Sequence, residues 1–345
     1  MKKVAMILLL AMLTMVFSAC SSSSENGKSG SSDKSKETIT VVWYPNESAD
    51  DLKDSRAAID EVIAKATGKK VVDKLTTDYN IAIEALVSGN AQLGLMGGEG
   101  YTEAHKKNAD VVPAVVNSGA SGTLKDALYH SWISVQTKDA SKYMKDGKPS
   151  IDNIVGKKMS FVSPSSTSGF AIPTSRIITH FGDQDKYKDL KVEDMQQGGK
   201  FFSQVLFGQS HQGSAANLLM GKADVAAFMD LLTPNYFSLV SGKLNEEGSV
   251  LKVRDNASDP FTSLKGKEFT VLSVTPVLNG PIAMNSKALS KEDQKKIQDA
   301  LTSDETANNS KVFAPEGEKG IFSKDGKSRF VKVEDSWYDA IRDLH

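Results

Sequence analysis

The sequence contains a single cysteine, Cys20, among 345 residues. No disulfide can form within one chain, so a chain of this size must be stabilised by a packed hydrophobic core. Long apolar runs are also scarce, and the stretch from Val4 to Phe17 is too short for a helix that spans a bilayer. These absences predict a globular protein outside the disulfide-rich and integral-membrane classes.

Several functional signatures are missing too. The formal charge is −1, from 42 basic and 43 acidic residues, with no basic stripe, so we expect no nucleic-acid partner. The sequence has no His-x-x-x-His pair, and we expect no metal and no cofactor. The scattered histidines are His105, His130, His180, His211 and His345.

A hydrolase is the enzymatic alternative, because Ser166 or Ser168, His211, and Asp224 or Asp230 provide the residue types of a catalytic triad. However, no Gly-x-Ser-x-Gly elbow is present, and four adjacent hydroxyls stand where one activated nucleophile would be needed. We therefore predict that the protein is not an enzyme.

The N-terminal region has the pattern of an export signal. Two lysines precede the apolar stretch, and Ser18 and Ala19 lie directly before Cys20. This pattern resembles a bacterial lipobox and predicts a signal peptide over residues 1–19 with lipidation of Cys20; ordinary secretion with an unmodified cysteine is the alternative. Residues 20–36 are rich in serine and predict a flexible tether. We expect an extracytoplasmic protein anchored by lipid to the cell membrane.

From residue 37 onward, apolar runs alternate with segments of helical period. This alternation predicts an α/β fold with mainly parallel sheets flanked by helices, in two units with a ligand cleft between them. The expected strands are 38–44, 69–75, 91–96, 111–116, 131–135, 159–162, 200–206, 223–228 and 269–277. The expected helices are 50–67, 79–88, 214–220, 291–301 and 336–344.

The segment Lys158–Arg176 reads as a strand, a loop and the start of a helix. Its loop places Ser165, Ser166, Thr167 and Ser168 beside Gly169. Hydroxyls and unpaired N–H groups at a helix start can bind an oxyanion. The alternative is a cluster that only caps the helix.

Five motifs in order resemble one family, the phosphate, phosphite and phosphonate substrate-binding proteins of ABC transporters. The resemblance covers residues 38 to about 290. The motifs are Thr77-Asp78-Tyr79-Asn80, the Leu93–Met96 strand with Tyr101–Ala104, Tyr129-His130-Ser131, the Ser165–Gly169 loop followed by Pro173, and His211 thirteen residues before Asp224.

This resemblance implies a two-lobed periplasmic-binding-protein fold (type II), with lobe one at 37–132 plus 275–345 and lobe two at 133–274. It implies a small oxyanion ligand, an ABC permease as partner, and a monomer. The ligand-binding residues implied are Tyr79, Tyr129, Ser166, Thr167, Ser168, His211 as a donor that can carry charge, and Asp230.

Two departures from the family leave the ligand open. Asn279 stands where aminoethylphosphonate binders have an aspartate, and Asp230 lies one residue before the second family carboxylate, whose place Leu231 takes. Phosphite, phosphate, methylphosphonate or an ester remain possible. An aromatic or nucleoside-like ligand lined by Trp43, Tyr44, Tyr101 and Trp132 is one alternative, and an adhesin or sensor lipoprotein is another.

Overall fold

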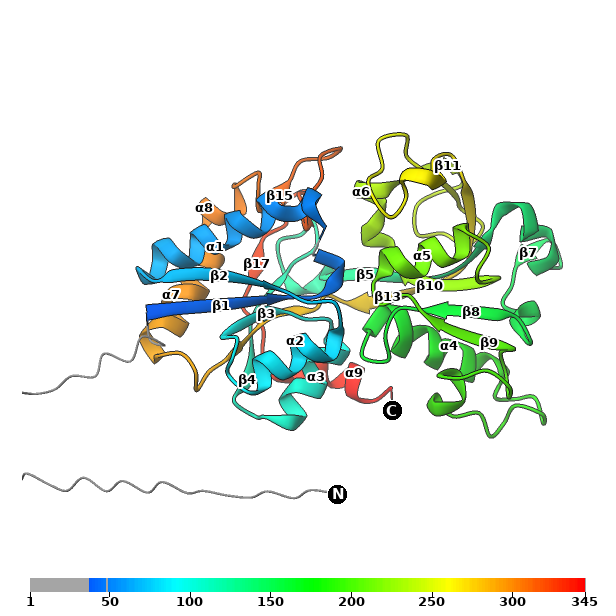
Figure 1. Cartoon of the computed structure of the whole chain (residues 1–345), viewed down its shortest axis with the longest axis horizontal. Coiled ribbons are helices and arrows are strands. Elements are labelled where there is room, and N and C mark those ends of the chain that lie inside the picture. The colour runs from blue at the N-terminus through cyan, green and yellow to red at the C-terminus, as the bar shows by residue number, and fades with distance from the viewer. Residues whose placement is uncertain (1–36, 48, 345) are drawn as a thin grey trace, which may run out of the picture. The chain divides into compact units, whose positions relative to one another are not determined.

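The computed structural model of the chain describes residues 37–47 and 49–344 (Figure 1). These residues all belong to one compact unit of the chain. The signal peptide, Cys20 and the tether that we predict lie outside the described residues. Within the described part, no helix is long and apolar enough to cross a membrane.

Two large sheets organise the unit, and each is the centre of one lobe. The sheet of the first lobe has the order β17-β4-β14-β3-β1-β2, and that of the second lobe β11-β12-β13-β5-β10-β8-β9. The first-lobe strands are β1 Thr38–Trp43, β2 Lys70–Leu75, β3 Leu93–Leu95, β4 Val111–Asn117, β14 Pro281–Asn285 and β17 Phe330–Val331. The second-lobe strands are β5 Leu128–Gln136, β8 Lys158–Phe161, β9 Gln204–Phe207, β10 Val225–Met229, β11 Phe237–Ser241, β12 Val250–Val253 and β13 Glu268–Leu278.

Helices cover both sheets. Those of the first lobe are α1 Lys53–Thr67, α2 Tyr79–Val87, α3 Gly98–Lys107, α7 Lys291–Leu301, α8 Asp304–Ala307 and α9 Asp339–Arg342, and those of the second are α4 Ile172–Phe181, α5 His211–Leu219 and α6 Thr233–Tyr236. Short pairs, β6 Met144–Lys145 with β7 Lys148–Pro149 and β15 Phe313–Ala314 with β16 Phe322–Ser323, complete the described strands.

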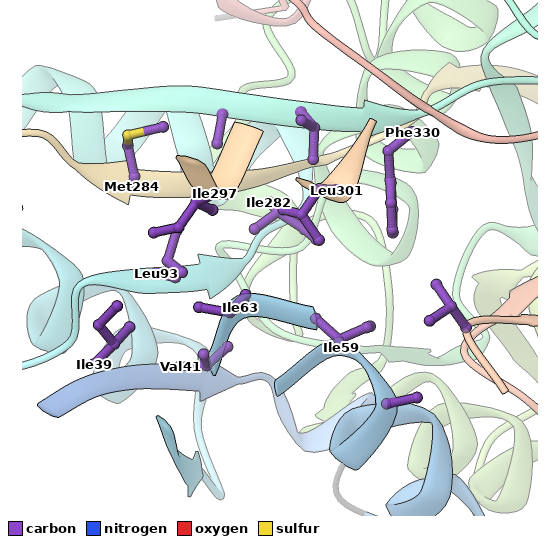
Figure 2. Packing of buried hydrophobic residues seen from close by; sticks show 14 of the residues in the cluster. Ile39, Val41, Ile59, Ile63, Leu93, Ile282, Met284, Ile297, Leu301 and Phe330 are labelled. Atoms are coloured by element: carbon purple, nitrogen blue, oxygen red, sulfur yellow. The ribbon is translucent and has the colours of Figure 1, made fainter. Parts of the chain in front are cut away.

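Side chains on the two faces of β1 pack into two different hydrophobic clusters. Val41 packs in the cluster that includes Ile59 and Ile63 of α1, which Figure 2 shows beside Ile297 and Leu301 of α7. Val42 points to the opposite face and packs with the cluster of α2 and α3. Because successive side chains of a strand point to opposite faces, this continuous apolar run buries residues against helices on both sides.

The two-lobed α/β fold is confirmed, but the expectation of mainly parallel sheets needs correction. In the two large sheets, parallel pairing is limited to β1 with β2 and β3, and to β8 with β9 and β10. The other pairings are antiparallel. The physical reason is that the chain passes between the lobes along two neighbouring strands. β5 leads into the second lobe and β13 leads back to the first, so these two strands run in opposite directions.

The crossing strands also contain the predicted lobe boundaries. Trp132 of β5 pairs with Val274 of β13, and Ser131 pairs with Thr275. The division at 132/133 and 274/275 stays a prediction. Two expected elements are shorter than predicted: the strand near residue 200 begins at Gln204, and the last helix is a 3₁₀ turn, Asp335–Tyr338, followed by α9.

Candidate ligand-binding site

A cavity of about 130 Å³ is lined by segments of both lobes. The first lobe contributes Tyr44, Asn46, Glu47, Leu52, Tyr79, Leu95, Met96, Gly97, Asn117, Asn279, Gly280 and residues 320–323. The second contributes Ser166, Thr167, Ser168, His211, Gln212, Met229, Leu231, Leu232 and Asn235, and Tyr129 lines the cavity from β5. The cavity thus collects six of the seven ligand-binding residues that the sequence suggested.

The serine-rich loop is built as the sequence predicts, as a link between β8 and a helix. Ser166 is the N-cap, and its Oγ accepts a hydrogen bond from the Gly169 N–H at 3.1 Å. Thr167–Ala171 forms a π-helical turn that continues into α4. A Cβ at position 169 would lie 2.3 Å from a methyl of Val162, so glycine is required for this close packing.

Four helical segments begin at the cavity. Tyr79 is the first residue of α2, Gly97 caps α3, Thr167 opens the π-helical turn and His211 is the first residue of α5. The first N–H groups of a helix lack intrahelical partners and carry partial positive charge. Two of them are used between lobes, because the Glu99 N–H donates to Thr167 Oγ1 at 2.9 Å and the His211 N–H donates to Asn46 Oδ1 at 3.0 Å. This arrangement favours an anionic ligand.

His211 is neutral in this site. Burial lowers its pKa to about 3, and Nδ1 accepts a hydrogen bond from the Met229 N–H at 3.1 Å. The ring proton is therefore assigned to Nε2, which remains a neutral donor. The expectation that His211 can carry charge is corrected, since the ring is 3% exposed and has no carboxylate partner among the described residues.

The two tyrosines are donors that stay protonated. Tyr79 accepts a hydrogen bond from Asn46 Nδ2 at 2.7 Å and stacks on Tyr44 with ring centroids 4.0 Å apart. Burial raises the pKa of Tyr79 far above its usual value. Burial also raises the pKa of Tyr129 to about 12, although hydrogen bonding with Ser168 opposes this rise.

Asp230 is the one suggested ligand-binding residue that does not line the cavity. It is absent from the cavity lining, and its oxygens are used by other groups: Oδ1 accepts from the His130 N–H at 2.9 Å, and Oδ2 contacts His130 Nδ1 at 2.9 Å and accepts from Asn245 Nδ2 at 3.0 Å. Leu231 lines the cavity instead. Asp230 and Leu231 are adjacent residues of the 3₁₀ turn Asp230–Leu232 that follows β10, where successive side chains point in different directions, which explains why a shift of one residue matters.

The structure adds two site residues that the sequence reasoning missed, Asn46 and Glu47. Both lie in the 3₁₀ turn Pro45–Glu47 that directly follows β1. Burial raises the pKa of the Glu47 carboxyl to about 8. Their position directly after a buried strand could have identified them as site residues, because ligands of α/β proteins bind at the carboxyl ends of the strands.

The alternatives from the sequence find no support in this geometry. The triad candidates have separate partners: His211 faces Met229, Asp230 faces His130, and Asp224 Oδ2 accepts from the Lys158 N–H at 2.9 Å. Three of the four aromatics proposed to line an aromatic site, Trp43, Tyr101 and Trp132, are core residues outside the lining, while Tyr44 lines the cavity.

Comparison with known proteins shows the family of this chain. The profile of a family described as the periplasmic substrate-binding protein of phosphonate ABC transporters matches residues 41–338. The chain belongs to this family. The family's profile thus spans both sheets and every residue named above as lining the cavity.

A curated member, the "Phosphate-import protein PhnD" of Mycolicibacterium smegmatis, is 28% identical over 200 residues, which are 57% of this chain. The match spans just over half of that relative, 56% of its length.

Two solved structures share the fold of this chain. PhnD1 from Prochlorococcus marinus, in complex with methylphosphonate, has a TM-score of 0.62 at 14% identity, covering 90% of this chain and 97% of that one. A binding protein component of an ABC phosphonate transporter from Pseudomonas aeruginosa has a TM-score of 0.62 at 19% identity, covering 90% and 85%.

Proposed function

We propose that this chain is the substrate-binding lipoprotein of an ABC importer. It captures a small phosphorus oxyanion, a phosphonate, phosphite or phosphate ester, between its two lobes and delivers it to a membrane permease. The protein acts as a monomer, without catalysis, and is held outside the cytoplasm by lipid on Cys20.

The proposal rests on the hydrogen-bond donors that line the cavity. Four helical N-termini and the side chains of Tyr79, Tyr129, Ser166, Thr167 and Ser168 surround a small volume. Neither lysine nor arginine occurs among the described residues that line it. A tetrahedral oxyanion offers several acceptors, which convergent neutral donors satisfy without a full countercharge.

The chemistry of the two altered family positions favours ligands without an ammonium group. Asn279 and Leu231 line the cavity, so neither position supplies a carboxylate. The proposal therefore ranks methylphosphonate, phosphite and phosphate ahead of aminoethylphosphonate. The methylphosphonate bound to the Prochlorococcus marinus structure supports this ranking by analogy of fold.

A thermal-shift panel on the purified protein tests the function. It compares phosphate, phosphite, methylphosphonate, aminoethylphosphonate and sulfate with nucleosides and aromatic vitamins. A ligand at a hundred times its Kd stabilises the folded state by about 2.7 kcal/mol. A shift with a phosphorus oxyanion supports the proposal, a shift only with aromatic compounds contradicts the ligand class, and no shift at all favours the adhesin or sensor alternative.

A further inference from the structure

Glu47 is a carboxyl group placed inside a site built for anions. It ends the 3₁₀ turn after β1, lines the cavity and is 9% exposed. Its Oε2 is buried and has no hydrogen-bond partner among the described residues. A buried acceptor without a donor is costly, so this oxygen needs either a proton of its own or a donor from the ligand.

The nearest cation does not pair with this carboxylate. Arg56 of α1 donates through Nη1 to the backbone carbonyls of Glu47 and Ala49, and its Nε contacts Asp73 Oδ2 at 3.3 Å. Arg56 thus forms its ion pair with Asp73. Its charge lowers the pKa of Glu47 by less than burial raises it.

The other titratable groups near Glu47 give no further positive charge. Lys319, beyond Tyr236, is paired with Asp51 at 2.6 Å. The neutral groups near Glu47 are Tyr44 after β1, Tyr79 of α2, Tyr129 of β5 and Tyr236 of α6, and neutral His211 of α5 lies in the same cavity lining.

An oxyanion bound at Ser166–Ser168 would therefore meet an ionised Glu47 in a cavity without a cationic side chain in its described lining. Like charges repel strongly where water is excluded. A protonated Glu47 instead supplies one more O–H donor, directed at an acceptor oxygen of the ligand.

We propose that Glu47 is a specificity-determining residue that carries a proton in the ligand complex, so that oxyanion binding is linked to proton uptake at alkaline pH. The inference rests on the proposed function and deepens it. In the step, an ionised Glu47 takes one proton from solvent as one oxyanion binds; the proton then lies between the carboxyl and a ligand oxygen. Burial already raises the pKa of Glu47 to about 8 in the free protein, so uptake is half complete near pH 8 and approaches one proton well above that pH.

The experiment is calorimetric titration of the full chain with methylphosphonate from pH 6 to pH 9.5, for the wild type and Glu47→Gln. Glutamine keeps the shape and a donor but does not titrate. The ratio of the wild-type Kd to the variant Kd removes the ligand's own titration. We expect a constant ratio below pH 7 that rises toward tenfold per pH unit well above pH 8. Glu61→Gln, at an exposed position of α1, is the matched control and should follow the wild type.

Proton uptake is measured directly by repeating the titrations at pH 9 in two buffers of different ionisation enthalpy. The wild type should take up close to one proton more than Glu47→Gln. If Glu47→Gln fails to fold, Glu47→Ala, which also does not titrate, replaces it in both measurements, because a variant is needed to remove the ligand's own titration.

The outcomes separate this inference from the function on which it rests. Binding of methylphosphonate with a flat ratio of Kd values overturns the role of Glu47 and leaves the proposed function standing. A ratio that falls with pH also overturns it, because an ionised Glu47 would then favour binding, as it would for a ligand that carries an ammonium group. Absence of binding to methylphosphonate, phosphite and phosphate in both proteins overturns the function and the inference together.

Discussion

Asn46 of the first lobe accepts, through Oδ1, a hydrogen bond from the backbone N–H of His211 in the second lobe at 3.0 Å. The same side chain donates from Nδ2 to Tyr79 OH at 2.7 Å. One buried amide thus connects the lobes and orients a tyrosine of the cavity. A contact between lobes stabilises the closed form, to which the ligand contributes by touching both sides.

Replacing Asn46 by alanine should weaken ligand binding about fivefold to tenfold. The change removes one hydrogen bond between lobes, worth about 1 kcal/mol, and leaves Tyr79 less well oriented. Calorimetric titration measures the loss. Asn153→Ala is the control, because Asn153 Nδ2 donates to the Lys142 carbonyl within the second lobe, at 2.8 Å. Equal affinities for the two variants would show that the Asn46 contact has no role in closure.

Thr167→Val should reduce ligand affinity by more than about tenfold, through loss of a hydrogen bond to a charged ligand. The substitution preserves shape but also removes the acceptor for the Glu99 N–H. The melting temperature of the ligand-free protein should change by less than about 2 °C. Binding and thermal unfolding are measured in parallel.

Thr174→Val is the matched control for Thr167→Val. Thr174 is fully buried in α4, and its Oγ1 has no hydrogen-bond partner among the described residues, so its hydroxyl should be dispensable. A similar loss of affinity in both variants, or a large loss of ligand-free stability in Thr167→Val, would assign Thr167 a structural role.

The buried ring of His211 should make the free energy of unfolding depend on pH. The folded protein keeps the ring neutral because burial lowers its pKa to about 3, whereas the unfolded chain binds a proton near pH 6.5. The unfolded state therefore holds more protons, and this contribution to stability is lost as pH falls below about 6.5. Between pH 6.5 and pH 5, the wild type should lose about 1.5 kcal/mol more than His211→Gln.

Urea unfolding at several pH values measures this difference for His211. Other titrating groups affect both proteins equally and are removed by subtraction. Parallel curves for the wild type and His211→Gln between pH 5 and pH 6.5 would contradict a buried neutral ring.

Cys20→Ser should release the protein from the membrane fraction, because serine cannot accept the proposed lipid. The ligand affinity should stay unchanged, since Tyr79, Ser166–Ser168 and the other groups that line the cavity are not altered. Cell fractionation and the mass of the mature N-terminus measure the effect, with Ser21→Ala as the control. A wild-type protein of unmodified mass would contradict lipidation.

The sequence by itself indicated the α/β character and most of the strands and helices, although not α3, and it indicated local motifs that lie in the cavity lining. The helix starts at Tyr79, Thr167 and His211 are specified locally by Asp78, Ser166 and Ser210 as caps, each accepting a hydrogen bond from an N–H two or three residues ahead. The start of α5 at His211 lies three residues before the start expected at 214. The apolar runs likewise predicted most strands, because burial follows side-chain period.

Only the tertiary structure decided which side chains meet in the cavity. Asn46 and Glu47 reach it because β1 ends at the same edge where the helices of both lobes begin. Asp230 is turned toward His130, while its neighbour Leu231 lines the cavity. Such outcomes depend on strand pairing between distant segments and on a register of one residue, neither of which a local pattern specifies. The pKa shifts of His211 and Glu47 likewise come mainly from burial, which arises only once the two lobes pack around them.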